Sequence, residues 1–437
     1  MASTPSEKSA AKREDATPAR PGVPGGPALS RRAALRLAGI GLGSLVAAAG
    51  GVARSESYPA LDAPAGRALD YAPNKGKFAA PELMVASRLV DSIPVFGSSE
   101  LVTLPTDVPQ VPRGLLGTHD YGLDFWCVGD AGYMSLWHAI ALGAYAGPMV
   151  SSLAPSGELA AGVFDARASN KVVLIVSPQW FYPGGAWRDA VTSHFSFRLW
   201  RAFCQSPNVT PAQVEYCRGR LLERGVDALS VRAGCDDTLP DLANAVALGF
   251  KEEHETRAQI RYVLRDRPDI IVDKADVQAA DGAPDWDALL AEAAEQAREE
   301  TTSNDFGFLD SFWNEHLAND FAAGKYKDSQ KSDNLLMAPT EDKDLALALD
   351  VARQGGLDVL CVLLPWSGPW EDYRGLSKTQ RDRRNETLRS IVTSHGARLA
   401  DFSERAYEPY FVYDGTHPGW VGWLEIERAV YEFAMGE

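Results

Sequence analysis

Residues 93–101, Ile-Pro-Val-Phe-Gly-Ser-Ser-Glu-Leu, join a short apolar run to a glycine and two serines. An apolar run of this length that stops at a glycine is typical of a strand buried on both faces. Gly97 permits a tight turn from strand to helix, and a serine there projects its hydroxyl toward the amide groups of the following helix. The stretch therefore predicts a buried strand followed by a candidate nucleophile.

Three other apolar runs end in the same way, at small or turn-forming residues. They are residues 125–128 before Gly129, residues 172–176 before Ser177-Pro178, and residues 359–364 before Pro365. Stretches of helical length lie between them, such as residues 136–145 and 345–354. Strands that alternate with helices predict a layered α/β domain with a parallel sheet.

The middle of the chain, about residues 183–304, has a different pattern. Residues 195–204, 212–224 and 286–300 have helical periodicity, and Pro and Asp separate them. We expect a mostly helical insertion that stands over one edge of the sheet. It would interrupt a single body that spans residues 54–437.

The first 53 residues have the composition of a targeting region. Residues 1–29 are rich in Pro, Ala, Ser and Gly and predict a disordered tail on the cytoplasmic side. In residues 30–53, a basic cluster with paired arginines precedes an uncharged run, which predicts a twin-arginine-like export signal or a membrane anchor. Gly51-Val52-Ala53 would suit cleavage, but we favour a retained anchor over cleavage or a buried core helix.

In both export alternatives the arginines hold the amino end inside, so residues 54–437 would lie outside the membrane. That body carries 36 basic against 56 acidic residues, a net charge of −20. Such an acidic body lacks the footprint of a nucleic-acid-binding protein. The five cysteines show no CxxC pair or zinc-ligand spacing, so we expect no metal and no cofactor. One disulfide is neither required nor excluded.

A second chemical signal lies near the carboxyl terminus. Residues 413–420 are Tyr-Asp-Gly-Thr-His-Pro-Gly-Trp. A nucleophilic serine needs a base, and the base needs a partner that fixes its tautomer. Asp414 could bind one ring nitrogen of His417 and leave the other for a serine, although a surface Asx turn with a capping histidine also fits. A serine after the first strand and Asp-x-x-His at the end is the chain order of the SGNH, or GDSL-type, hydrolases.

Four segments resemble, in order, the motifs of the DltD family of D-alanyl-lipoteichoic acid biosynthesis proteins. They are residues 94–101 (PVFGSSEL), 177–181 (SPQWF), 301–307 (TTSN followed by Phe306-Gly307) and 414–423 (DGTHPGWVGW). The resemblance runs from about Leu83 to the end of the chain. It implies a three-layer α/β/α SGNH-like domain outside the membrane, held by one amino-terminal helix. It also implies Ser99 as the nucleophile, with Asp414 and His417 as its triad partners.

An acyl-transfer site also needs an oxyanion hole, a set of preorganised donors for the tetrahedral oxygen. The candidates are the Ser99 amide, an amide of the turn from Gly129 to Gly132, and the side chain of Gln179. SGNH proteins usually supply an asparagine after the third strand, where DltD-like chains carry the glutamine of SPQWF. The alternative for Gln179 is a polar turn residue that binds only backbone.

The resemblance implies a membrane-anchored acyltransferase that acts in D-alanylation of a teichoic or lipoteichoic acid. Its implied partners are a DltB-like membrane-bound O-acyltransferase, an acyl carrier protein, and an anionic envelope polymer as acceptor. Two alternatives remain: an esterase or thioesterase that hydrolyses acyl groups on envelope glycans or carriers, and a non-catalytic scaffold. Because a body at −20 repels a polyphosphate chain, the first hypothesis requires a local basic patch or a different acceptor.

Overall fold

The computed structural model describes residues 67–69, 93–101, 125–147, 149–151, 162–164, 170–182, 188–266, 271–273, 282–332 and 336–436. All of them belong to one unit of the chain, Arg54–Glu437. The predicted tail and the predicted signal or anchor, residues 1–53, lie outside the described residues. Among the helices that the structure describes, none is both long enough and apolar enough to cross a bilayer.

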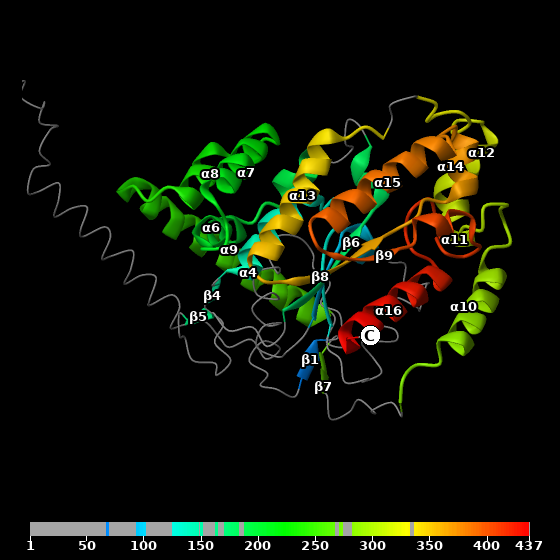
Figure 1. The fold of residues 1–437 in the computed structure, drawn as a ribbon, viewed down its shortest axis with the longest axis horizontal. Coiled ribbons are helices and arrows are strands. Elements are labelled where there is room, and N and C mark those ends of the chain that lie inside the picture. Colours follow the sequence, from blue (N-terminus) through cyan, green and yellow to red (C-terminus); the bar gives the residue numbers. More distant parts are fainter. Residues whose placement is uncertain are drawn as a thin grey trace, which may run out of the picture. The chain divides into compact units, whose positions relative to one another are not determined.

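A parallel sheet of five strands forms the centre of the fold, in the order β3-β2-β6-β8-β9 (Figure 1). The strands are β2 (Ile93–Phe96), β3 (Phe125–Val128), β6 (Lys171–Val176), β8 (Asp358–Leu363) and β9 (Arg398–Asp401). Every neighbouring pair is parallel. The α/β class, the parallel sheet and the four predicted strands are thus confirmed, each strand to within one residue. β9 was not predicted, because this edge strand is only partly buried and its sequence is not an apolar run.

The strand order places a topological switch point between β2 and β6. The chain first adds β3 on one side of β2 and then crosses to β6 on the other side. Ligands of open α/β sheets bind at such a point, beyond the carboxyl ends of the strands. Two short 3-10 helices begin there: η1 (Ser99–Leu101) after β2 and η2 (Pro178–Phe181) after β6. The first carries Ser99 and the second carries Gln179.

Helices cover both faces of the sheet, so the unit has three layers. Along β6, Val172, Leu174 and Val176 face one cluster of buried side chains, and Val173 and Ile175 face another. The first cluster includes side chains of α4 (Ser135–Ala146), α13 (Pro339–Gln354) and α15 (Lys378–Ser394), and the second includes those of α10 (Trp286–Glu300) and α16 (Trp420–Met435). Full burial of each such valine or isoleucine contributes about 1.5–3 kcal/mol. Figure 1 shows α13 and α16 on opposite sides of the strands.

Most of the region predicted as a helical insertion is helical. Its helices are α5 (Arg188–Ser193), α6 (Phe197–Gln205), α7 (Pro211–Glu223), α8 (Ala228–Cys235) and α9 (Leu239–Asp266). Two features differ from the expectation. A short strand, β7 (Ile271–Asp273), pairs antiparallel with β1 (Arg67–Leu69). In addition, Ala293 and Ala297 of α10 pack in the core beside α16, so α10 belongs to a layer of the sheet rather than to an insertion over its edge.

The remaining elements are short. They are the antiparallel pair β4 (Met149–Ser151) and β5 (Gly162–Phe164), the helices α11 (Asp310–Phe312), α12 (Ala318–Ala322) and α14 (Gly368–Arg374), a π-helical turn η5 (Trp313–Leu317), and a 3-10 turn η6 (Ser403–Tyr407). Between them, Phe306, Phe308, Trp313 and Trp370 form an aromatic cluster. This cluster fills the space next to the loop that carries His417, since Trp370 lies against Gly415.

Candidate functional site

Ser99 begins the turn that follows β2. The Gly97 amide donates to the carbonyl of Val128 at 3.0 Å, which continues the ladder one residue past the strand. A Cβ on Gly97 would lie 2.6 Å from Glu100 Oε1, so any larger residue would displace the Glu100 side chain. Ser99 is 8% exposed. The turn therefore holds a serine hydroxyl at the carboxyl edge of the sheet, largely shielded from water.

The loop before α16 holds Asp414 and His417 in a fixed geometry. Asp414 Oδ1 accepts the amides of Thr416 and His417, each at 2.7 Å, which closes an Asx turn. Asp414 Oδ2 lies 2.6 Å from His417 Nδ1. The sequence left two alternatives for Asp414: an Asx turn, or a partner that orients His417. The same carboxylate does both, one through each oxygen.

The turn after β2 and the loop before α16 meet at Ser99. Its Oγ lies 2.7 Å from His417 Nε2, within hydrogen-bond distance. The neighbouring Ser98 is engaged elsewhere: its hydroxyl donates to Glu100 Oε2 at 2.9 Å and accepts from Trp180 Nε1 at 3.2 Å. Of the two serines, Ser99 is therefore the one that forms the Ser-His-Asp arrangement.

The charges around His417 suit a proton acceptor. Although burial lowers the pKa of His417, the carboxylates of Asp414 and Glu100 raise it above its ordinary value. Burial raises the pKa of Asp414, but His417 and the amides of the Asx turn outweigh burial and hold that pKa below its usual range. An ionised Asp414 accepts a hydrogen bond from Nδ1–H of His417. The proton therefore stays on Nδ1, and the lone pair of Nε2 can accept the proton of Ser99.

Gln179 is the candidate oxyanion donor that the structure brings to the nucleophile. Its Nε2 donates to Ser99 Oγ at 3.3 Å. It therefore does more than bind backbone in a turn, which was the alternative. A side-chain amide at this position can move its donor to an oxygen that develops on the carbonyl attacked by Ser99.

The turn from Gly129 to Gly132 lies at the end of the neighbouring strand. A Cβ on Gly129 would lie 2.7 Å from the carbonyl oxygen of Gly97, so the two strand ends approach closely. Gly132 has a φ of 84°, which favours glycine. The Ala131 amide is bound by the side chain of Asp130 at 2.7 Å, and His194 Nε2 lies 2.7 Å from the Ala131 carbonyl oxygen. The Ala131 amide is thus already bound, which removes it from the candidate oxyanion donors of this turn.

Glu100 is a site residue to which the sequence analysis gave no role. It is fully buried, and it accepts the Ser98 amide at 2.6 Å as well as the Ser98 hydroxyl. Burial raises the pKa of Glu100, while its bonds to the Ser98 and Glu100 amides and the charge of His417 lower it. Its place directly after the two serines was the available signal. Glu100 holds the turn and adds a second carboxylate near His417.

Trp180 connects this turn to the core. Its ring stacks on His138 with centroids 5.1 Å apart, and burial lowers the pKa of His138 to about 3. Because His138 lies in an apolar helical stretch, its sequence context alone predicts a buried core histidine with satisfied polar atoms. The burial is right, but neither ring nitrogen has a hydrogen-bond partner among the described residues. Ring stacking, rather than hydrogen bonding, therefore holds this neutral histidine beneath Trp180.

The Thr-Thr-Ser-Asn motif supports the histidine loop from behind. Asn304 Oδ1 accepts the amides of Phe306 and Phe308 at 3.1 and 2.9 Å, which fixes the loop after α10. The next residue, Leu309, links this loop to the histidine loop, because its amide donates to the Tyr413 carbonyl at 2.9 Å. The motif thus positions Asp414 and His417 indirectly, through the backbone bond between Leu309 and Tyr413.

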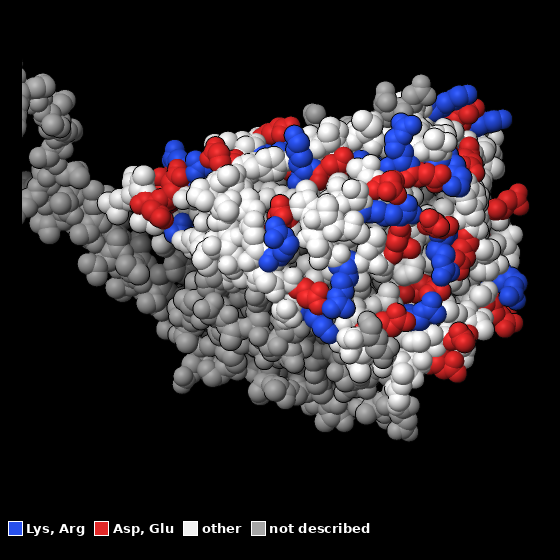
Figure 2. All heavy atoms as spheres, in the orientation of Figure 1, with Lys and Arg blue, Asp and Glu red and all other residues white. Residues whose placement is uncertain are grey.

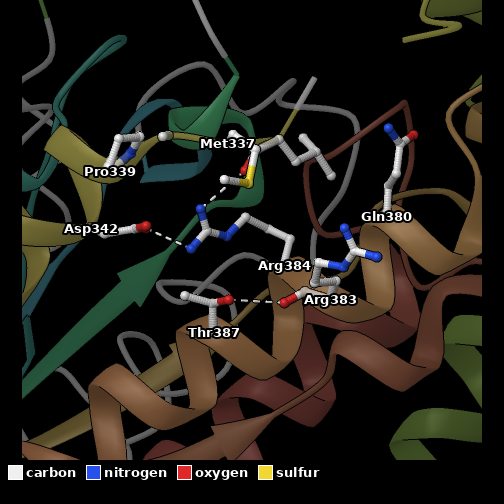
Figure 3. Close-up of a pocket in the computed structure, with 9 residues that line it drawn as sticks. Met337, Pro339, Asp342, Gln380, Arg383, Arg384 and Thr387 are labelled. Atoms are coloured by element: carbon white, nitrogen blue, oxygen red, sulfur yellow. Dashed lines mark hydrogen bonds and ion pairs between the residues drawn. The ribbon is translucent and has the colours of Figure 1, made fainter. Parts of the chain in front are cut away.

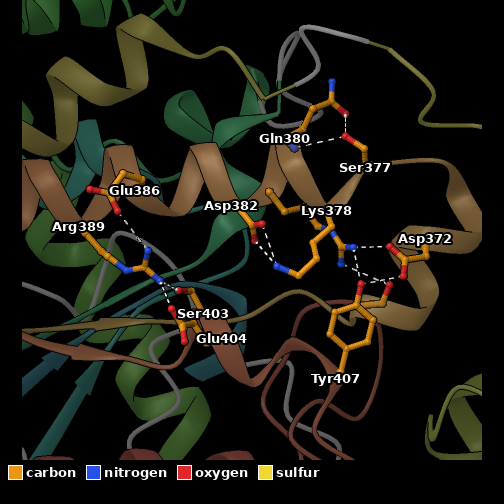
Figure 4. A network of polar contacts seen from close by, with 12 residues as sticks. Asp372, Ser377, Lys378, Gln380, Asp382, Glu386, Arg389, Ser403, Glu404 and Tyr407 are labelled. Atoms are coloured by element: carbon orange, nitrogen blue, oxygen red, sulfur yellow. Dashed lines mark hydrogen bonds and ion pairs between the residues drawn. The ribbon is translucent and has the colours of Figure 1, made fainter.

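Two cavities lie along α15, and basic side chains line both of them. In the smaller one, Arg384 binds Asp342 at 2.6 Å (Figure 3). The larger, of about 610 Å³, contains Lys378, Arg381 and Arg389. Their partners are Asp382 for Lys378, Asp372 for Arg381, and Glu386, Asp401 and Glu404 for Arg389 (Figure 4).

Each of these four cations therefore has a carboxylate partner. Figure 2 likewise shows acidic and basic side chains interspersed over this face. Arg383 also lines both cavities and has no ion-pair partner among the described residues, but a single unpaired arginine is not the local basic patch that a polyphosphate acceptor would require. Among the residues that the structure describes, no group of three or more His, Cys, Asp or Glu side chains is arranged to hold a metal ion.

Comparisons with known proteins agree over most of the chain. A family model described as "DltD protein" matches residues 67–435. Protein DltD of Staphylococcus aureus (strain NCTC 8325 / PS 47) is 26% identical over 349 residues, which cover 79% of this chain and 81% of the relative. Protein DltD of Bacillus subtilis (strain 168) is 23% identical over 351 residues, covering 78% and 82%. Protein DltD of Lacticaseibacillus rhamnosus is 24% identical over 359 residues, covering 78% and 77%.

Proposed function

The chain belongs to the DltD family, whose members take part in D-alanylation of lipoteichoic acid, and we propose that it is an acyltransferase with Ser99 as its nucleophile. The observation that carries this proposal is the contact of 2.7 Å between Ser99 Oγ and His417 Nε2. Family membership supports the broad role, and the Ser-His-Asp geometry supports the chemistry. The substrate would be an acyl donor, and the acceptor a hydroxyl of a cell-envelope polymer.

The proposed reaction has two halves. Ser99 Oγ attacks the acyl carbonyl while His417 Nε2 takes the serine proton, and Asp414 stabilises the imidazolium. The tetrahedral oxygen is bound by Gln179 and by backbone amides of the turns that follow β2 and β3. Collapse expels the leaving group, which receives the proton from His417, and leaves the acyl group on Ser99. A polymer hydroxyl then attacks this ester, with His417 as base again, and restores the free serine.

The position of the site supports an SGNH-like assignment. A nucleophile after the first sheet strand, a side-chain donor after the third, and an Asp-x-x-His loop before the last helix converge on the switch point of a 2-1-3-4-5 parallel sheet. Hydrolysis would use the same groups, since transfer differs only in the exclusion of water from the acyl-enzyme. The low exposure of Ser99 favours transfer over an open esterase site.

We place the domain outside the membrane, attached by the segment within residues 30–53, because that segment has the composition of an export signal or anchor. A membrane-bound O-acyltransferase of the DltB type would supply the acyl group directly or from an acyl carrier protein. Among the described residues, four of the five cations of α15 are already paired with carboxylates, and Arg383 is the exception. The anionic polymer would therefore reach Ser99 over another surface, or while bound to the membrane partner.

The test is a partition experiment on the full chain in detergent. p-Nitrophenyl acetate serves as acyl donor, and poly(glycerol phosphate) or water as competing acceptors. The proposal predicts an acetyl group on Ser99, seen by peptide mass spectrometry, that passes to the polymer faster than to water. Release to water alone would indicate the esterase, and a folded protein that never acquires the acetyl group would contradict both enzymatic functions. The scaffold alternative gains support if cells that carry Ser99→Ala keep normal envelope D-alanine.

A further inference from the structure

Two cysteines of the helical region lie next to each other in space. Cys204 lies on α6 and Cys235 is the last residue of α8, 31 positions later. Their Sγ atoms are 2.8 Å apart. A relative shift of about 0.8 Å would bring the sulfurs to the ~2.05 Å of a disulfide bond.

The packing of α6 against α8 fixes this proximity. The Trp200 Nε1 donates to the carbonyl of Val231 at 2.8 Å, and Arg201 Nη1 donates to that of Ala233 at 2.9 Å. A Cβ on Gly234 would lie 2.2 Å from the Trp200 ring, so the helices are pressed together one residue before Cys235. The two sulfurs are therefore held in register by contacts that do not depend on the cysteines themselves.

The two thiols differ in acidity in the way that disulfide formation needs. The hydrogen bond from Cys204 and the nearby guanidinium of Arg218 lower the pKa of Cys235, despite opposing burial. Burial raises the pKa of Cys204. Cys235, partly exposed, is thus the thiolate that reacts first, and Cys204 is the thiol placed to resolve the intermediate.

We propose that Cys204 and Cys235 form a disulfide bond when the folded protein meets a disulfide oxidant. The Cys235 thiolate attacks one sulfur of the oxidant, breaks its S–S bond and expels one thiolate, which takes up a proton. Cys204 then loses its proton and attacks the Cys235 sulfur of the mixed disulfide, which expels the second thiol. Two protein thiols and one oxidant disulfide thus become one protein disulfide and two small thiols. This proposal does not rest on the proposed acyltransferase.

The bond would stabilise the helices that support one side of the site. His194, just before α6, contacts the Ala131 carbonyl in the turn after β3. Ser196 caps α6 and its hydroxyl donates to Glu252 of α9. A covalent link between α6 and α8 would constrain the unfolded chain over this region, so oxidation should raise the melting temperature by several degrees.

Thiol counting tests the proposal directly. The full chain, reduced and then incubated with oxidised glutathione while folded, is denatured in iodoacetamide and digested for mass spectrometry. We expect three of the five cysteines, Cys127, Cys217 and Cys361, to carry the alkyl group. Cys204 and Cys235 should appear as one cross-linked peptide that dithiothreitol releases. Five alkylated cysteines after oxidation would overturn the proposal, and so would a cross-link that involves Cys217.

Variants provide a second measurement. Cys217→Ser is the matched control, because Cys217 is a fully buried thiol in the same helical region. It should keep the oxidation-dependent rise in melting temperature, whereas Cys235→Ser should lose it. If Cys235→Ser does not fold, the alkylation count on the wild-type chain still decides the question. An equal rise in Cys235→Ser and in the wild type would contradict the proposal.

Discussion

Ser99 Oγ and His417 Nε2 lie 2.7 Å apart although 318 positions separate the two residues. The parallel sheet explains this contact, because the turn after β2 and the loop before α16 both lie at its carboxyl edge. Tyr413 also stacks on His417 with ring centroids 5.9 Å apart, which limits rotation of the imidazole. The site is thus built on short, tightly bonded turns, and each of its members can be tested separately.

Asp414→Asn should leave the fold intact and reduce acylation of Ser99 by about 10⁴-fold, the effect of the corresponding change in serine proteases. Asparagine keeps an oxygen for the Asx turn but cannot accept the Nδ1 proton as an ion does, so His417 loses its productive tautomer. The measurement is the rate of p-nitrophenol release from p-nitrophenyl acetate, with circular dichroism as the check on folding. A rate within tenfold of the wild type would exclude Asp414 from the triad.

Gln179→Ala should reduce the same rate by about 10²- to 10³-fold, the usual effect of removing one oxyanion donor. The affinity for the acyl donor should change little, because the Gln179 amide binds mainly the oxygen of the tetrahedral intermediate. Ser98→Ala is the matched control, since it removes a hydroxyl from the turn that carries Ser99 but leaves Ser99, His417 and Gln179 in place. Equal losses in the two variants would indicate general damage to the site rather than a missing oxyanion donor.

Glu100→Gln should shift the pH dependence of acylation to lower pH. The carboxylate of Glu100 helps to raise the pKa of His417, so its neutralisation lowers that pKa. Because the base must be neutral to accept a proton, the acid limb of the pH–rate profile moves down with the pKa. Glutamine can still bind the Ser98 amide, so the turn that carries Ser99 should be preserved. An upward shift, or none, would show that the Glu100 charge does not act on His417.

Glu427→Gln should change the pH dependence of stability. Glu427 on α16 is 1% exposed, its carboxylate oxygens have no hydrogen-bond partner among the described residues, and burial raises its pKa well above the ordinary value. Above pH ~4.3 the unfolded chain loses this proton while the folded chain keeps it. The free energy of unfolding should therefore fall by about 1.4 kcal/mol per pH unit, up to the pKa of the folded state.

In Glu427→Gln this contribution to the slope of the free energy of unfolding against pH disappears. Urea unfolding at pH 5, 6 and 7 measures the slope. Glu432→Gln, at an exposed position on the same helix, serves as the control. The slope of the control should match the wild type. Parallel slopes for wild type and Glu427→Gln would mean that Glu427 is ionised in the fold.

The strands that build the site could be predicted from sequence because they are buried on both faces. Runs such as residues 172–176 are apolar at every position, and the residues just beyond them include Ser99 and Gln179. β9 was not predicted, because an edge strand needs no apolar pattern. β7 was not predicted, because three residues are too few to show a periodic pattern.

Long-range electrostatics was also beyond the sequence. Nothing in the order of residues shows that the charge of Glu100 acts on His417, which lies near the other end of the chain. The same holds for His138, whose burial followed from the apolar helix around it but whose lack of hydrogen bonds depends on Trp180 from another element. Both features depend on contacts between residues that are distant in the chain, and only the folded structure shows which of them come close.

Labelling of the full chain with a fluorophosphonate probe, followed by peptide mapping, measures directly whether His417 activates Ser99. We predict one phosphonylated residue, Ser99, with labelling lost in Ser99→Ala, strongly reduced in His417→Ala and retained in Ser98→Ala. Labelling on Ser98, or labelling of Ser99 that is unaffected by His417→Ala, would contradict a nucleophile activated by this histidine.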